Sequence, residues 1–383
     1  MTPTNRQPQH ALTRDPGPSG DARAGRLSVT PTGFEQRLLA RARQSGLRAN
    51  DIIVLGFSGG PDSLALASAM RWVNRRLGTN TVLVHVDHRL RPSSGAEAQR
   101  AAALAKNIGL RYEVHRLEAP PQERHRGVGI EEAARRERYR RLFGVARDLG
   151  AVAVATGHQL DDQAESVLLH LLRGAGVHGA AAMAAISAAP AWDRDVHDIS
   201  RESDESRSPF LWRPLLPESR AEIQKYIDFV GLTPLDDPSN LDQLFRRNRL
   251  RLEVLPRLTA LSPGAAEALA RYAALAAEDD ALLDKLAKAA CNACVHQGGV
   301  LDVTCLVTEP LPLQRRMVRR WLESWRGGEA ISMDRTEAVL ALSHAGEGGK
   351  TVEIGQGWSV RLKDGLLHAE WPKPVGATER GDQ

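Results

Sequence analysis

The residues best suited to chemistry lie in two short loops, and the first loop reads Ser-Gly-Gly-Pro-Asp-Ser. It follows an apolar run at 52–57 and precedes an alanine- and leucine-rich segment, a pattern that predicts a buried strand, a turn and a helix. Two glycines let backbone N–H groups converge, and serine hydroxyls add donors at the positive end of the helix dipole. The loop therefore predicts a phosphate site made by Ser58, Gly59, Gly60, Pro61, Asp62 and Ser63.

This first loop is not a Walker A loop. No Gly-Lys-Ser/Thr follows its glycines, so no lysine is placed to reach the β- and γ-phosphates of a nucleotide. The alternative interpretation is an ordinary strand-to-helix turn, in which Asp62 only favours the dipole of the following helix.

The second loop follows an apolar run at 151–156 and carries Gly157, His158, Asp161 and Asp162. Two acids thus open a helix beside the end of a strand. Taken alone, the loop is explained as well by Asp161 capping the helix and Asp162 favouring its dipole. Taken with the first loop, it predicts the second wall of a site, because parallel sheets bind ligands beyond the carboxyl ends of their strands.

Strands and helices that alternate along the chain must position these loops. Apolar runs at 52–57, 81–86, 112–115 and 151–156 predict strands, with helical segments between them. This alternation predicts an α/β fold with a parallel, doubly wound sheet. Asp87 and His88 directly follow the run at 81–86, so we expect them at the same edge.

The composition sets limits on the class of protein. The chain has 383 residues, enough for two domains, and a net charge of +4, which allows a nucleic-acid partner without requiring one. No apolar run approaches the ~20 residues of a membrane span, and the first thirty residues lack the apolar core of a secretion signal. Three cysteines favour a reducing, cytoplasmic location. Cys291 and Cys294 are better explained as small buried residues than as two ligands of a metal site, although a metal site stays open as an alternative.

Several motifs together carry a family resemblance. Ser-Gly-Gly-Pro-Asp-Ser resembles the signature of the PP-loop ATP pyrophosphatases, which cleave ATP to AMP and diphosphate while they adenylate a substrate oxygen. With five further motifs in order, the chain over about 50–260 resembles the tRNA(Ile)-lysidine synthetases. The matching segments are 58–63, 86–91, 131–139, 157–166, 213–215 and 237–251. The C-terminal part resembles that family's smaller substrate-binding region loosely, and no counterpart of a larger second C-terminal domain is expected.

The resemblance implies a reaction and its participants. ATP would adenylate the C2 oxygen of the wobble cytidine in the CAU anticodon of tRNA(Ile), and free L-lysine would then displace AMP to give lysidine. Mg²⁺ is implied beside ATP, with Asp62 and Asp162 as contacts to the metal or the amine and Asp161 as the alternate. Arg247, with Arg251, would steady phosphate charge. The nucleotide would lie near Asp87, His88, Gly157 and His158, and a homodimer is left open.

The expected domains combine this resemblance with the composition along the chain. They are a disordered tail at 1–31, a PP-loop ATP-binding catalytic domain at 32–216, a connector with a basic helix at 217–260, and a smaller α+β tRNA-binding domain at 261–383. An acidic stretch at 187–209 is expected to be a surface insertion. Basic helices at 246–251 and 315–320 are expected to contact tRNA phosphates.

Two other classes remain open at this stage. A PP-loop tRNA thiolase would use the same adenylation but needs cysteines or an iron–sulfur cluster close to the phosphate loop, whereas Cys291, Cys294 and Cys305 lie far downstream. A non-enzymatic RNA-binding protein with a decayed nucleotide fold is the second, and the intact acids and glycines of both loops argue against it.

Overall fold

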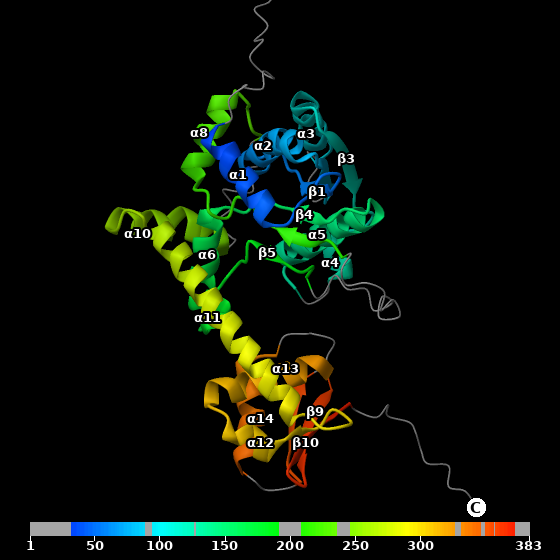
Figure 1. The fold of residues 1–383 in the computed structure, drawn as a ribbon, viewed down its shortest axis with the longest axis vertical. Helices are drawn as coiled ribbons and strands as arrows, with labels where there is room; N and C mark the ends of the chain where they lie inside the picture. Colours follow the sequence, from blue (N-terminus) through cyan, green and yellow to red (C-terminus); the bar gives the residue numbers. More distant parts are fainter. Residues whose placement is uncertain are drawn as a thin grey trace, which may run out of the picture.

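The computed structural model has two parts arranged along its long axis and connected by one long helix (Figure 1). It describes residues 32–88, 94–125, 128–190, 208–235, 246–325, 331–345, 349–355 and 357–371. The expected tail at 1–31, most of the acidic stretch and the turn at 237–240 lie outside the described residues.

The larger part contains a six-stranded sheet with the order β3-β2-β1-β4-β6-β5. All neighbours pair in parallel except β5, which runs antiparallel to β6. The predicted parallel α/β sheet is therefore confirmed. The strands are β1 (Ile52–Gly56), β2 (Asn80–Asp87), β3 (Arg111–Arg116), β4 (Ala153–Ala155), β5 (Ile186–Ser187) and β6 (Phe210–Trp212).

The strand order reverses between β1 and β4. From β1 the chain moves outward through β2 to β3. From β4 it crosses to the other side of the sheet, where it forms the edge strand β5 and then β6 between β5 and β4. The loops that follow β1 and β4 thus leave neighbouring strands at the switch point of the sheet, where ligands bind in folds of this kind.

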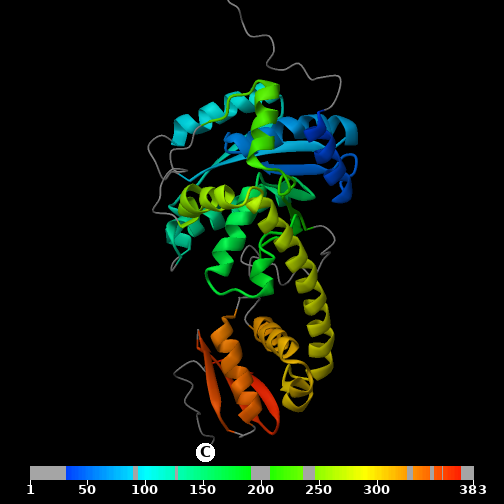
Figure 2. The same cartoon turned by 90° about the vertical axis from the view of Figure 1, so that its left-hand side faces the viewer.

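Helices cover both faces of this sheet. On one face α1 (Gly33–Gln44), α2 (Pro61–Leu77), α3 (Ser94–Ile108) and α8 (Arg220–Val230) share a core with β1. On the other face α5 (Ile130–Asp148) packs Tyr139, Leu142 and Phe143 against Val54 and Val154. The short α4 (Pro121–Arg124) precedes α5, while α6 (Leu160–Leu171) and α7 (Val177–Ala180) extend from the sheet toward the smaller part (Figure 2).

A helical stretch with a π-helical turn in it precedes the long helix α11 (Ala265–Cys294). It consists of α9 (Arg246–Arg249), a π-helical turn η5 (Leu250–Val254) and α10 (Leu255–Leu261). The 30-residue α11 follows. No glycine or proline interrupts this segment, so the helix continues without a break. It packs against α6 and α7 and then enters the smaller part.

The smaller part combines helices with a four-stranded antiparallel sheet of order β7-β10-β9-β8, so the expected α+β fold is confirmed. The strands are β7 (Leu301–Asp302), β8 (Thr351–Gly355), β9 (Trp358–Lys363) and β10 (Leu366–Glu370). The helices are α12 (Val303–Thr308), α13 (Leu311–Trp325) and α14 (Met333–Ala345).

The cysteines differ in part from the expectation. Cys291 is a buried free thiol in the core of the smaller part, as an ordinary small residue would be. Cys294 and Cys305, however, form a disulfide, which the sequence did not predict. Because disulfides persist mainly in oxidising compartments, the low number of cysteines does not by itself locate the protein. Among the described helices, none has the length and apolar character needed to cross a membrane.

Candidate active site

The first loop forms an open, donor-rich helix N-terminus. Gly59 has a φ of +81°, and a Cβ there would lie 2.7 Å from Leu235 Cδ1, so this position requires glycine. Gly60 precedes α2 without providing a side-chain cap. The Oγ atoms of Ser58 and Ser63 lie 3.2 Å apart, and Ser58 Oγ accepts a hydrogen bond from Gly60 N at 3.3 Å. Uncapped N–H groups, hydroxyls and the helix dipole together suit an anion.

The second loop lies directly against the first because residue 157 is glycine. A Cβ on Gly157 would be 3.1 Å from both the carbonyl carbon of Asp62 and the backbone nitrogen of Ser63. Any larger residue would have to displace the start of α2. The structure thus brings together the two loops that the sequence predicted as walls of one site.

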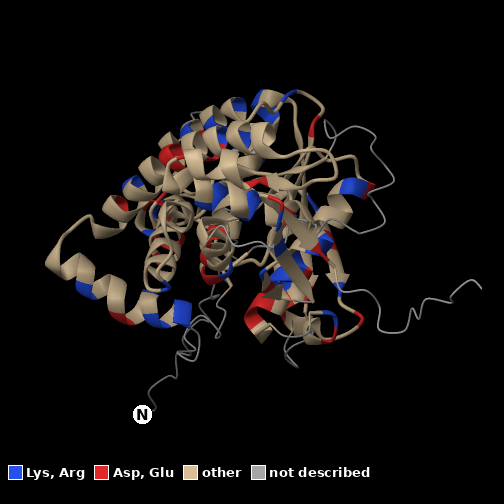
Figure 3. Cartoon of the chain, turned by 90° about the horizontal axis from the view of Figure 1, so that it is seen from below, with Lys and Arg blue, Asp and Glu red and all other residues tan. Residues whose placement is uncertain are grey.

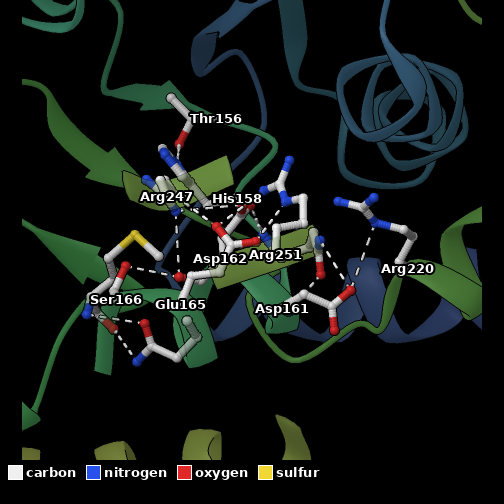
Figure 4. A network of polar contacts seen from close by, with 12 residues as sticks. Thr156, His158, Asp161, Asp162, Glu165, Ser166, Arg220, Arg247 and Arg251 are labelled. Carbon is white, nitrogen blue, oxygen red and sulfur yellow. Dashed lines mark hydrogen bonds and ion pairs between the residues drawn. The ribbon is translucent and has the colours of Figure 1, made fainter. Parts of the chain in front are cut away.

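Asp162 both caps α6 and forms ion pairs. Its Oδ2 accepts from Gln159 N at 3.0 Å, while Gln159 Oε1 accepts from Asp161 N at 2.7 Å. Its Oδ1 is 2.8 Å from Arg251 Nη2 and 3.4 Å from Arg247 Nη2. The N-cap is therefore Gln159 rather than Asp161, whose Oδ2 faces Arg220 Nε at 3.7 Å (Figure 4).

A buried glutamate that the sequence did not single out organises the two arginines. Glu165 is fully buried, with Oε2 at 2.8 Å from Arg247 Nε and Oε1 at 2.6 Å from Arg251 Nε. It follows Asp161 by four residues and Asp162 by three on α6. This helical spacing places Glu165 on the same face as the two acids, and it was the one sequence signal that could have identified Glu165 as a site residue. Both arginines, which the sequence predicted to steady phosphate charge, point into an acidic cluster in this structure (Figure 4).

Asp62 lies in a different electrostatic environment from Asp162. Burial, followed by the charge of Asp162, raises the pKa of Asp62 to about 6. Burial alone would also raise the pKa of Asp162, but Arg247 and Arg251 hold it below its ordinary value. Asp62 Oδ1 is buried and has no hydrogen-bond partner within the described part of the chain. A carboxylate oxygen of this kind beside a second carboxylate attracts a cation.

The donor set fits Mg²⁺ bound in the company of phosphate groups. No cluster of three metal-ligating side chains is found among the described residues, so an all-protein metal cage is not formed there. Mg²⁺ usually takes one or two carboxylates and completes its coordination with substrate phosphates and water. Asp62, next to the anion site of α2, meets that requirement.

The other residues that the sequence predicted for the nucleotide site lie at the same edge of the sheet. His158 Nδ1 lies 2.8 Å from Thr156 Oγ1, and burial lowers the pKa of His158 to about 3. Burial also lowers the pKa of His88 to about 4, with Arg138 of α5 as the next cause. Both imidazoles are thus neutral at pH 7. Asp87 is buried at the end of β2, 3.6 Å from Arg116 Nε.

The arginines of α13 all have carboxylate partners. Arg315 pairs with Glu337 at 2.5 Å, Arg316 with Asp280 at 2.7 Å, and Arg319 and Arg320 with Glu323 and Asp284 at 3.5 Å each. Asp280 also meets His178 of α7 at 2.9 Å. Seen from below, basic and acidic residues are mixed along the helices (Figure 3). Arg316 and Asp280 thus help to fix α13 on α11.

Comparison with known proteins agrees with this arrangement. Residues 32–258 match the family model of the PP-loop domain, and residues 301–368 match that of the TilS substrate binding domain. A protein from Salinispora tropica described as tRNA(Ile)-lysidine synthase is 38% identical over 320 residues, which cover 83% of this chain and 90% of that protein. A protein of the same description from Symbiobacterium thermophilum is 37% identical over 333 residues, covering 84% of this chain and 65% of that protein.

Among solved structures, a U34-tRNA thiolase from Methanococcus maripaludis has a TM-score of 0.50 at 17% identity. The match covers 63% of this chain and 77% of that one. At this level of identity the similarity shows a shared fold and nothing about the reaction.

Proposed function

Because this chain belongs to the family of the tRNA(Ile)-lysidine synthases, we propose that it joins free L-lysine to C2 of the wobble cytidine in the CAU anticodon of tRNA(Ile), at the expense of ATP. The observation that carries the assignment of the site is the buried Oδ1 of Asp62, which has no hydrogen-bond partner among the described residues. Asp62 belongs to the uncapped first turn of α2 and is close enough to Asp162 for that charge to raise its pKa. Anion donors and an acid pair thus adjoin each other, as a reaction between a nucleotide and an amine requires.

In the first half-reaction the C2 oxygen of cytosine attacks the α-phosphorus of ATP, and diphosphate leaves. The N–H groups at the start of α2 and the hydroxyls of Ser58 and Ser63 would bind the departing diphosphate. Asp62 would hold Mg²⁺, which when bound neutralises phosphate charge. Gly157 keeps the second loop close enough for Asp162 to face the same space.

In the second half-reaction the amine of lysine forms a bond to C2, the bond from C2 to its oxygen breaks, and AMP leaves with that oxygen. The amine arrives as an ammonium ion and must lose protons. Asp162, kept ionised by Arg247 and Arg251, would attract the ammonium. Asp62, whose carboxylate would hold Mg²⁺, is not free to take these protons, which would pass to water. Two neighbouring acids with different environments commonly divide such roles.

The tRNA must present its anticodon base outside the stacked helix for this chemistry, because the C2 oxygen is not accessible to ATP in a stack. The smaller part of the chain would bind other regions of the tRNA. This division of labour is supported by the match of residues 301–368 to a substrate binding domain.

Sulfur transfer is the less suitable alternative for this site. All three cysteines of the chain belong to the smaller part, where Cys294 and Cys305 are bonded to each other and Cys291 is buried. None of them lies in the loops around Asp62 and Asp162, so the thiol that a tRNA thiolase needs is missing from this site.

The decisive experiment is incubation of the protein with ATP, radiolabelled lysine and unmodified tRNA(Ile), followed by nucleoside analysis. We expect labelled lysidine that depends on ATP, with AMP and diphosphate released in equal amounts. The Asp162→Asn protein serves as the matched control and should incorporate little lysine. A labelled product without ATP, or none with all substrates present, would contradict the proposal.

A further inference from the structure

Three tryptophans gather on the surface of the smaller part. Trp325 ends α13, Trp358 begins β9 and Trp371 follows β10. The ring centroids of Trp325 and Trp358 are 6.4 Å apart, and those of Trp358 and Trp371 are 4.7 Å apart. Trp371 is 58% exposed and Trp325 is 36% exposed, whereas Trp72, Trp212 and Trp321 are buried. Exposed tryptophans are costly to keep in water and typically mark a binding surface.

A cavity of about 390 Å³ opens beside Trp325. Its wall is preformed, because Trp321 Nε1 donates to Gly299 O at 2.7 Å. Gly299 has a φ of +74°, and a Cβ there would lie 2.5 Å from Trp325, so glycine is needed for this close contact. We call this cavity the tryptophan pocket. Its lining includes Asn292, Gly299, Arg320, Trp321, Ser324 and Trp325. Trp358 and Trp371 lie outside this lining and are connected to it by ring contacts through Trp325.

The polar groups of the tryptophan pocket are suited to a nucleotide. The Asn292 amide offers donors and an acceptor of the kind that read the edge of a base. Ser324 Oγ donates to Trp321 O at 2.6 Å and so offers the pocket an acceptor. Arg320 forms a long ion pair with Asp284, at 3.5 Å, and its side chain is 38% exposed. Its guanidinium is therefore accessible from solvent at the pocket. Lys288 is exposed one helical turn before Asn292 on α11. Cations beside an exposed aromatic ring match a phosphate followed by a stacked base.

The pocket is far from the acid pair. Asp162 begins the 12-residue α6, and α11 meets α7 through Asp280, 12 residues before Asn292. Both helices run along the long axis of the molecule (Figure 2). At about 1.5 Å per residue, these two paths separate the pocket from Asp162 by on the order of 30 Å. A nucleotide in the pocket therefore belongs to a region of the RNA other than the reacting anticodon.

We propose that the tryptophan pocket holds one unpaired nucleotide of the tRNA from outside the anticodon loop, with its base stacked on Trp325, the exposed tryptophan of the pocket lining. The inference rests on the proposed function for the identity of the RNA. It adds a specific contact by which the smaller part would recognise the tRNA, through stacking rather than through the arginines of α13 alone.

The test compares two RNA substrates in the lysidine assay: full-length tRNA(Ile) and its isolated anticodon stem–loop. For Trp325→Leu we expect the KM for full-length tRNA to rise about tenfold, because loss of one stacked base costs about that much affinity. For Trp371→Ala, outside the pocket lining, we expect a smaller rise of this KM. The kcat and the KM for the stem–loop should stay unchanged. Trp325→Phe, which keeps an aromatic face, should retain most of the affinity.

Several outcomes would overturn the inference. One is an unchanged KM for full-length tRNA in both Trp371→Ala and Trp325→Leu; another is an equal rise for the stem–loop. Equal effects of leucine and phenylalanine at position 325 would show a packing role instead of stacking. Phe229→Ala, which removes an aromatic ring that is 65% exposed on α8, is the control and should leave both KM values unchanged. If the parent protein makes no lysidine from either RNA, the proposed function fails instead.

Discussion

Replacing Asp62 by asparagine should stabilise the protein while it abolishes activity. The pKa of Asp62 is raised from its ordinary value of 3.8 to about 6, first by burial and then by the charge of Asp162. One pKa unit is worth about 1.4 kcal/mol, so at pH 7 ionised Asp62 costs the folded state about 3 kcal/mol relative to the unfolded chain. The dipole of α2 favours the charge by at most about 1 kcal/mol, and Asp62→Asn should therefore gain about 2 kcal/mol.

The pH dependence of this gain has a definite sign. The folded-state pKa is above the unfolded one, so the cost is absent below pH 3.8, grows as pH rises, and is complete above about pH 6. Asparagine does not ionise and carries no such cost. The stability difference between Asp62→Asn and the parent protein should thus be about 2 kcal/mol at pH 7.5 and shrink toward zero near pH 4.

Urea unfolding followed by circular dichroism at both pH values measures this difference. Asp279→Asn, which changes an exposed acid on α11, is the matched control and should stay within about 0.5 kcal/mol of the parent protein. In parallel, Asp62→Asn should lose lysine incorporation by orders of magnitude with little change in tRNA affinity. A variant that is no more stable at pH 7.5, or one whose gain is the same at pH 4, would refute the reasoning.

Three further substitutions address other parts of the site and of the domain contact. Glu165→Gln removes the buried carboxylate that both arginines contact, and should lower the free energy of unfolding by about 3–5 kcal/mol in urea titrations; a neutral result would show that Asp162 alone suffices. Gly157→Ala pushes on the start of α2 and should raise the KM for ATP about tenfold or more, with tRNA binding preserved. Asp280→Asn leaves Arg316, whose side chain is 12% exposed, without its carboxylate and should cost about 1–3 kcal/mol and raise the KM for tRNA but not for ATP; equal effects on both substrates would argue against a domain contact.

Much of the fold was predictable because its signals are local. Apolar runs separated by helical segments indicate a parallel sheet, and the order of a doubly wound sheet places the loops after β1 and β4 side by side. The proximity of Asp62 and Asp162 follows from that rule. Gly157 was expected near the nucleotide, but its role as the point of closest approach depends on a distance that no sequence pattern contains.

The contacts that escaped prediction are those between distant segments. Arg247 and Arg251 were expected to steady phosphate charge, since their spacing shows one face of a helix but not which side chains cover it. Their partner, Glu165, is 82 and 86 residues away in the sequence. The bond between Cys294 and Cys305 likewise depends on how α12 folds back on the end of α11. Such pairings require the tertiary structure.

The unbroken α11 has a mechanical consequence. A helix of 30 residues is about 45 Å long and is held near its middle by the contact of Asp280 with His178. A tilt of α11 about this contact with α7 would therefore move its two ends in opposite directions. A tilt of about 5° there would move the end of the helix, with the smaller part packed on it, by about 2 Å, since the segment beyond Asp280 is about 20 Å long. In a tRNA bound to both parts of the chain, such a tilt would shift the anticodon relative to the acid pair. Displacements of about 1 Å at a reacting atom can change a rate by about a hundredfold.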